Sequence, residues 1–196
     1  MASVEENKLI KRNKILEAAY DLFAKKGIKM TAIDDVVKGA GIAKGTFYLY
    51  FHDKYDLMDQ IILYKSSEII KSVISQMREI ETTDKLETVD LILFFVDAII
   101  DYMKENREIL TIVNQKISLL YTMIMDDESE NVQEDIKYLI KIISKLGFTY
   151  EEAKKQIFLL SSMICSVCSN AIISGKPYDI EDIRPEIHNL VKKILL

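Results

Sequence analysis

The sequence predicts an all-α protein, and three observations carry this prediction. Glycine and proline are scarce, at six and two of 196 residues, whereas sheet proteins need many tight turns. Apolar residues recur at helical spacing over long stretches, as in Ile136, Leu139, Ile140 and Ile143. Hydrophobic residues make up 49% of the chain, which is enough for a substantial buried core.

Helix starts are marked by a capping residue followed three positions later by an acid, because both side chains suit the free N–H groups there. Such pairs stand at Ser3/Glu6, Thr31/Asp34, Asp53/Asp56, Asp84/Glu87, Thr149/Glu152 and Asp179/Asp182. Stops are marked by Gly27, Gly147 and the run Gly175-Lys176-Pro177. These signals predict about nine helices, at 4–26, 33–39, 44–50, 54–80, 84–105, 107–126, 130–146, 150–174 and 180–195.

Charge divides the chain into two parts. The formal net charge of −5 argues weakly against a nucleic-acid partner. However, residues 1–55 carry ten basic and seven acidic side chains, a net of +3, and residues 56–196 carry a net of −8. We therefore expect two domains, 1–55 and 56–196, of which the first is able to meet a polyanion.

The longest uninterrupted apolar run, Leu91 to Val96, has six residues, far fewer than the roughly 20 needed to span a bilayer. The first residues are acidic and lack the apolar segment of a signal peptide. We therefore expect a cytoplasmic protein with no membrane partner. Two cysteines in the chain exclude a fold built on a disulfide framework.

Residues 27–54 have the pattern of a helix-turn-helix. The helix at 33–39 would bury its apolar face, Gly39-Ala40-Gly41 permits a tight turn, and a second short helix begins near Lys44. That second helix suits a major groove, because polar, basic and aromatic side chains are left exposed on it, at Lys44, Thr46, Tyr48 and Tyr50. Gly45 would permit close approach to a sugar-phosphate backbone, and Lys54 would favour a phosphate at the next helix start.

At these residues the sequence closely resembles the TetR (tetracycline-repressor) family of transcriptional regulators. The similar stretch runs from Ile15 to Leu57 and includes Ile15-Leu16-Glu17-Ala18-Ala19, Leu22-Phe23, Gly27, Thr31, Ile33, Val36, Ala40-Gly41-Ile42, Lys44-Gly45-Thr46-Phe47-Tyr48, Tyr50-Phe51 and Lys54. The resemblance implies homodimers that bind a palindromic operator and usually repress transcription. It also implies DNA contacts at Thr31, Lys44, Thr46, Tyr48, Tyr50 and Lys54, to which the open position Gly45 is added.

Two qualifications apply to this DNA-binding site. Many family members have Ser or Thr where this chain has Ala43, and Ala cannot cap the recognition helix, which costs about 0.5–2 kcal/mol of local stability. For Tyr48 and Tyr50, simple packing is the alternative to DNA contact, and for Lys44 it is a solvated lysine.

Residues 56–196 are predicted to form a helical effector-binding and dimerisation domain. The helix at 150–174 is apolar or small nearly all round, and the helix at 180–195 carries an apolar stripe. Two such helices from each subunit would form a four-helix bundle across a twofold axis, which matches the family's mode of dimerisation. The alternative is a buried central helix in a monomer.

A small-molecule pocket is predicted in the same domain. Apolar walls with a few hydroxyls are the common form of such a site, and candidate wall residues are Tyr64, Phe95, Tyr102, Met103, Tyr121, Met125, Phe158 and Ser162. They suit a small, largely apolar effector, although each also suits the core. Asp90, Asp97 and Asp101 fall on one narrow strip of the helix at 84–105, where a solvated face is favoured over recognition of a cation.

Cys165 and Cys168 sit in mid-helix and are interpreted as packed thiols, with redox chemistry or metal binding as the alternatives. We expect no catalytic residues, no cofactor and no metal, because the sequence lacks Glu-x-x-His pairs, a phosphate loop and a nucleophile elbow. The favoured function is a ligand-responsive repressor. The alternative is a ligand-binding or interaction protein of the same fold without operator binding.

Overall fold

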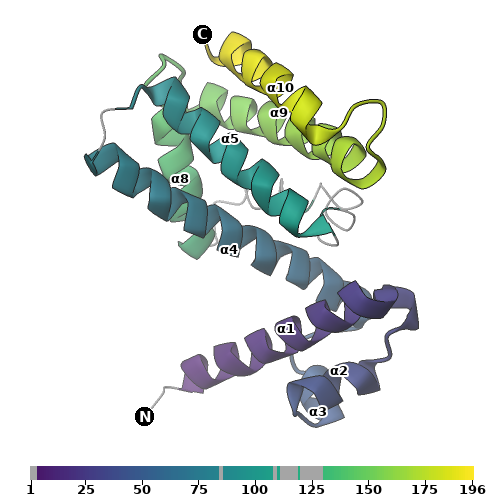
Figure 1. Cartoon of the computed structure of the whole chain (residues 1–196). Coiled ribbons are helices and arrows are strands. Elements are labelled where there is room, and N and C mark those ends of the chain that lie inside the picture. The colour runs from purple at the N-terminus through teal and green to yellow at the C-terminus, as the bar shows by residue number, and fades with distance from the viewer. Residues whose placement is uncertain (1–3, 84–85, 108–109, 111–118, 120–129) are drawn as a thin grey trace. The chain divides into compact units, whose positions relative to one another are not determined.

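The structure is a computed structural model that describes residues 4–83, 86–107, 110, 119 and 130–196. These residues form helices and no strands (Figure 1), which confirms the all-α prediction. The helices are α1 (Val4–Met30), α2 (Ile33–Ala40), α3 (Lys44–Phe47), α4 (Lys54–Thr83), α5 (Thr88–Glu105), α8 (Glu130–Ser144), α9 (Tyr150–Cys168), the π-helical η1 (Ser169–Ser174) and α10 (Ile180–Leu195).

The chain divides into two compact units, unit 1 (Met1–Lys65) and unit 2 (Ser66–Leu196). The domain boundary expected after residue 55 falls at the start of α4, whereas the division between the two units falls inside that helix. Helix α4 therefore contributes its first part to unit 1 and its remainder to unit 2.

Unit 1 is built around aromatic side chains that close the helix-turn-helix. Phe47 and Phe51 are 0% and 2% exposed, and their ring centroids lie 5.6 Å apart. They share the core with Val36 and Val37 of α2 and with the apolar stripe of α1. The turn after α2 needs a left-handed residue, which Gly41 supplies at φ 66°.

Unit 2 is a bundle in which α5, α8, α9 and α10 share one hydrophobic core with the later part of α4. The predicted helix at 150–174 is present as α9 and η1, which follow each other without a break and end at Gly175. Most of the predicted helix at 107–126, including Tyr121 and Met125, lies outside the described residues.

Three of the predicted caps are confirmed: Asp53, Thr149 and Asp179 each accept backbone N–H groups at the start of α4, α9 and α10. The cap predicted at Thr31 is wrong, since the residue before α2 is Ala32 and its N–H donates to Asp35 Oδ2. The helix predicted at 44–50 ends at Phe47, because Leu49 and Tyr50 donate to carbonyls three residues back and tighten the chain into turns.

The capping box of α9 gives a first prediction. Thr149→Ala removes the hydroxyl that accepts from Glu152 N and should lower the free energy of unfolding by about 1 kcal/mol, as measured in urea. Thr149→Ser keeps the hydroxyl and should behave nearly as the wild type. Equal losses in both variants would contradict the capping role.

Candidate DNA-binding interface and effector cavity

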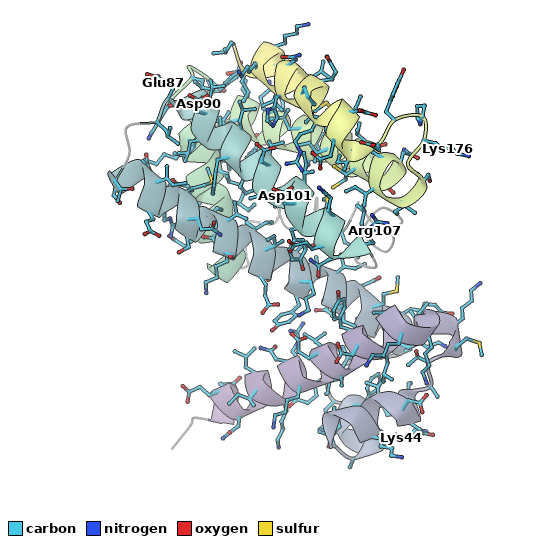
Figure 2. The ribbon with its side chains drawn as sticks, in the orientation of Figure 1. Lys44, Glu87, Asp90, Asp101, Arg107 and Lys176 are labelled. Carbon is cyan, nitrogen blue, oxygen red and sulfur yellow. The ribbon has the colours of Figure 1, made fainter. Side chains whose placement is uncertain are left out.

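The recognition element of unit 1 presents a cation at its start. Lys44 is 53% exposed by its side chain and lies at the outer edge of α3 (Figure 2), where its Nζ pairs with Asp34 Oδ1 at 2.7 Å. The hydrogen bond from Lys44 to Asp34 raises the pKa of Lys44. Because both partners are exposed, the ion pair is weak and leaves the lysine able to exchange a carboxylate for a phosphate.

Two large side chains of the following turn face solvent. Tyr48 is 53% exposed although its ring meets Phe47 edge-on, and Leu49 is 81% exposed. Tyr50 is only partly exposed, with its ring 6.3 Å from that of Phe51. Leu49 is not among the residues predicted for this interface, although its place between two tyrosines and off the Phe47–Phe51 face indicates that it is exposed.

Gly45 is not required by the fold. Its backbone is helical, and a Cβ built there would meet nothing within 4 Å. Glycine in a helix costs about 1 kcal/mol relative to alanine. The described part of the chain would therefore accept an alanine at position 45.

Thr31 and Lys54 have structural roles that the sequence analysis did not foresee. Thr31 is 1% exposed and its hydroxyl donates to Gly27 O at 2.8 Å, so its side chain offers nothing to a phosphate. Lys54 Nζ donates to the carbonyls of Lys29 and Thr31 at 3.0 and 3.3 Å. These bonds hold the end of α1 against the start of α4, since the final carbonyls of a helix accept from cations.

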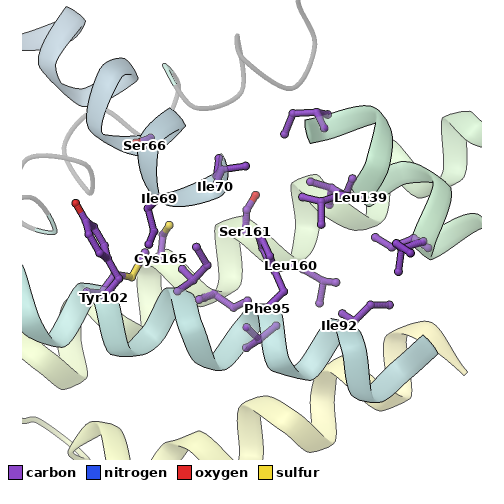
Figure 3. A pocket seen from close by; sticks show the side chains of 18 of the residues that line it. Ser66, Ile69, Ile70, Ile92, Phe95, Tyr102, Leu139, Leu160, Ser161 and Cys165 are labelled. Carbon is purple, nitrogen blue, oxygen red and sulfur yellow. The ribbon is translucent and has the colours of Figure 1, made fainter. Parts of the chain in front are cut away.

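Unit 2 contains a cavity of about 170 Å³ (Figure 3). Its walls come from α4, α5, α8 and α9, with Leu110. Of the predicted wall residues, Phe95, Tyr102 and Met103 line it. Phe158 and Ser162 do not line it, because α9 turns Leu160, Ser161 and Cys165 toward the cavity instead, and Tyr64 belongs to unit 1.

Aliphatic side chains dominate these walls, and the described residues that line the cavity include no charged side chain. Burial raises the pKa of Cys165, which lines the cavity, to about 11, and that of Cys168 to about 12. Both thiols are therefore protonated at neutral pH, which fits packed thiols and not a reactive nucleophile. No group of three or more potential metal-ligating side chains occurs in the described part of the chain.

The acidic strip of α5 faces solvent as predicted, with Asp101 exposed and Asp97 partly exposed, but these two carboxylates are also paired. Arg184 of α10 donates to Asp97 at 3.1 Å and to Asp101 at 2.5 Å, and His188 Nε2 lies 2.8 Å from Asp97. Asp90 is exposed. This network joins α5 to α10. Its cation, Arg184, lies 87 positions from Asp97 in the sequence, so helical spacing alone does not indicate the pair.

Helix α9 with η1 exposes apolar surface on the side away from the cavity. Leu159 and Ile173 are 51% and 44% exposed, and Leu190 of α10 is 45% exposed. By length and composition alone, Tyr150–Ser174 is apolar enough to cross a membrane, with only 39% of its most apolar window buried within the chain. The count of uninterrupted apolar residues did not reveal this segment, because serines and Asn170 divide it into short apolar runs.

Comparison with known proteins relates the helix-turn-helix region to a known family. The family model described as bacterial regulatory proteins, tetR family, matches residues 15–61. The uncharacterized HTH-type transcriptional regulator YvdT of Bacillus subtilis is 49% identical over 51 residues, which are 26% of each protein. Residues 15–61, which lie in unit 1, therefore carry the sequence pattern of the TetR family. The chain spans about a quarter of the length of the relative that it matches.

Solved structures extend the similarity to the whole TetR fold. The fatty acid degradation regulator FadR from Bacillus halodurans has a TM-score of 0.60 at 20% identity, covering 92% of this chain and 94% of that one. The Thermus thermophilus FadR, a TetR family transcriptional repressor in complex with lauroyl-CoA, has a TM-score of 0.63 at 15% identity, covering 94% and 95%. At these identities the likeness shows the fold alone.

The different roles of the two lysines give a second prediction. Lys54→Ala should lower the free energy of unfolding by about 1 kcal/mol, because two helix-end carbonyls lose a charged donor. Lys44→Ala removes only an exposed ion pair and should leave unfolding nearly unchanged. Thermal and urea unfolding of both variants measure this, and equal stability of the two would contradict a positioning role for Lys54.

Proposed function

We propose that this chain is a ligand-responsive transcriptional repressor that binds a palindromic operator as a homodimer and is released by a small, largely apolar effector. One observation carries the proposal: the turn and helix from Lys44 to Leu49 expose a cation, a glycine and two large side chains, Tyr48 and Leu49. Exposure of large side chains to water is unfavourable without a partner. The size and charge of this surface suit a major groove.

Within this interface, some side chains are placed to contact base edges and others to contact phosphates. Lys44 and Thr46 lie at the start of the recognition element, from which base edges are contacted in helix-turn-helix proteins. Tyr48 and Tyr50 carry hydroxyls suited to phosphates. Thr31 and Lys54, expected as phosphate contacts, are reassigned as residues that position the recognition element.

The homodimer is supported by the unpartnered apolar faces of α9, η1 and α10. An apolar helix that is less than half buried in its own chain requires another surface. Pairing these helices with their copies around a twofold axis gives a four-helix bundle. The same axis would set two recognition elements about 34 Å apart, one turn of DNA.

The effector is supported by the cavity of unit 2 and by the course of α4. Ser66, Ile69 and Ile70 of α4 line the cavity, and the same helix begins at Lys54 in unit 1. A ligand that moves this helix would change the spacing of the recognition elements. The lauroyl-CoA complex of the Thermus thermophilus protein supports an apolar effector. If the chain binds no DNA, the alternative of a ligand-binding protein without an operator takes its place.

Gly45 offers a test that separates stability from DNA binding. Gly45→Ala should leave the free energy of unfolding unchanged or raise it by up to about 1 kcal/mol, while weakening operator binding at least tenfold through a clash with the DNA backbone. Fluorescence anisotropy with an operator selected from random DNA measures the affinity.

The matched control is Gly39→Ala, whose added methyl group would meet only Ala18 Cβ at an ordinary 3.5 Å. This control should keep wild-type affinity. Full operator affinity in Gly45→Ala would show that the open position does not face DNA.

The dimer interface is tested by introducing a charge into it. Leu159→Glu should convert a dimer of 22.6 kDa chains into monomers and abolish operator binding, because two buried carboxylates would face each other across the axis. Analytical ultracentrifugation gives the mass. Leu86→Glu, at an exposed leucine outside α9 and α10, should remain dimeric. A dimeric Leu159→Glu would place the interface elsewhere.

A further inference from the structure

We propose that the cavity of unit 2 holds a single unbranched aliphatic chain of about a dozen carbons, with the polar head of the ligand at the Tyr102 end. This inference rests on the proposed function, since it names the effector class of the same site. It depends on the length, the volume and the polarity of the cavity.

The length follows from α5. The lining residues of this helix are Ile92, Phe95, Val96, Ile99, Tyr102 and Met103, which form one face over three turns. At a rise of 1.5 Å per residue this face is about 16 Å long. With carbon–carbon bonds of about 1.5 Å meeting at about 111°, an extended chain advances about 1.25 Å per carbon, so about thirteen carbons fit.

The shape of the ligand is limited by the volume. A cavity of about 170 Å³ suits one slender chain and is too small for a fused four-ring skeleton. A fused-ring molecule needs breadth as well as length, whereas an aliphatic chain needs little more than its own thickness. The aliphatic walls offer isoleucine and leucine methyl groups along this path, and burial of each methylene there is worth about 0.8 kcal/mol in transfer from water.

The orientation follows from the polar atoms. Figure 3 shows Tyr102, Cys165 and Ser66 toward one end of the cavity and Ile92 and Leu139 toward the other. Ser161 lies between the two ends, but its hydroxyl donates to Phe158 O at 3.1 Å. Because no charged side chain occurs among the described lining residues, a charged group carried inside would be buried without a partner, which is strongly unfavourable. The chain therefore enters tail first toward Ile92, and the head stays at the Tyr102 end.

The test is direct binding of the full-length protein to straight-chain ligands, measured by calorimetry without DNA. The probes are saturated fatty acids and their coenzyme A thioesters with 6 to 18 carbons, and a steroid acid as the bulky comparison. We expect an affinity maximum near 12 carbons and at least tenfold weaker binding of the steroid acid. The two series distinguish a free carboxylate head from a thioester head. Tighter binding of the steroid acid than of every straight chain would overturn the proposal.

Two opposite substitutions at Ile92 test the length and the orientation. Ile92→Phe fills the apolar end and should move the optimum to shorter chains by two or more carbons, and Ile92→Ala should move it to longer chains. Leu86→Phe adds the same bulk at an exposed position and should leave the optimum unchanged. An optimum that neither Ile92 variant moves would contradict the assigned orientation.

Tyr102→Phe tests the polar end, since loss of the hydroxyl should weaken binding several-fold without moving the optimum. A shift of the optimum in this variant would place the tail, and not the head, at that end. Because binding is measured without DNA, chains that bind but fail to release the operator would refute the proposed release mechanism and leave this inference standing.

Discussion

From Ile157 to Cys168, helix α9 carries only apolar and small side chains, and the architecture of unit 2 depends on how these are covered. Ile157, Leu160 and Ile164 face the shared core and the cavity. The side toward Leu159 is left uncovered by its own chain. An unsatisfied apolar helix face is the strongest driving force for association available to such a protein. One helix thereby shapes the wall of the effector cavity and, in our proposal, the dimer axis, so that ligand binding and dimer geometry depend on the same element.

Unit 1 separates the side chains that hold the fold from those left for a partner. Phe47, Phe51, Thr31 and Lys54 are committed to packing or to backbone carbonyls. Lys44, Gly45 and Leu49 contribute little to the fold and are exposed. The net charge of −5 conceals this division, because the acidic remainder outweighs a basic first domain. Recognition of a polyanion depends on the charge at the surface of one unit, within a few Debye lengths of the polyanion, and not on the net charge of the whole chain.

Patterns of a few neighbouring residues predicted the features that interactions between neighbouring residues determine, such as the start of a helix. Helical periodicity and the caps at Asp53, Thr149 and Asp179 located their helices, because a cap acts within three residues. Contacts brought together by tertiary structure were not predicted: Lys54 reaches carbonyls 23 and 25 residues away, and Arg184 meets Asp97 across 87 positions. Of the described residues predicted to line the cavity, the three on α5 do so. Phe158 and Ser162 lie off the lining face of α9, where one position in the sequence rotates a side chain by about 100°. Helical periodicity predicts the apolar face of a helix, whereas the element that packs against this face depends on the tertiary structure.

The proposed function depends on two copies of this helix-turn-helix binding DNA together. Selection of bound sequences from random double-stranded DNA at low salt, by the full-length protein, tests this most directly. We expect an inverted repeat whose half-site centres lie about one helical turn apart, roughly 10 base pairs, or a multiple of it. Enrichment of no sequence, or of a single unrepeated half-site, would contradict it.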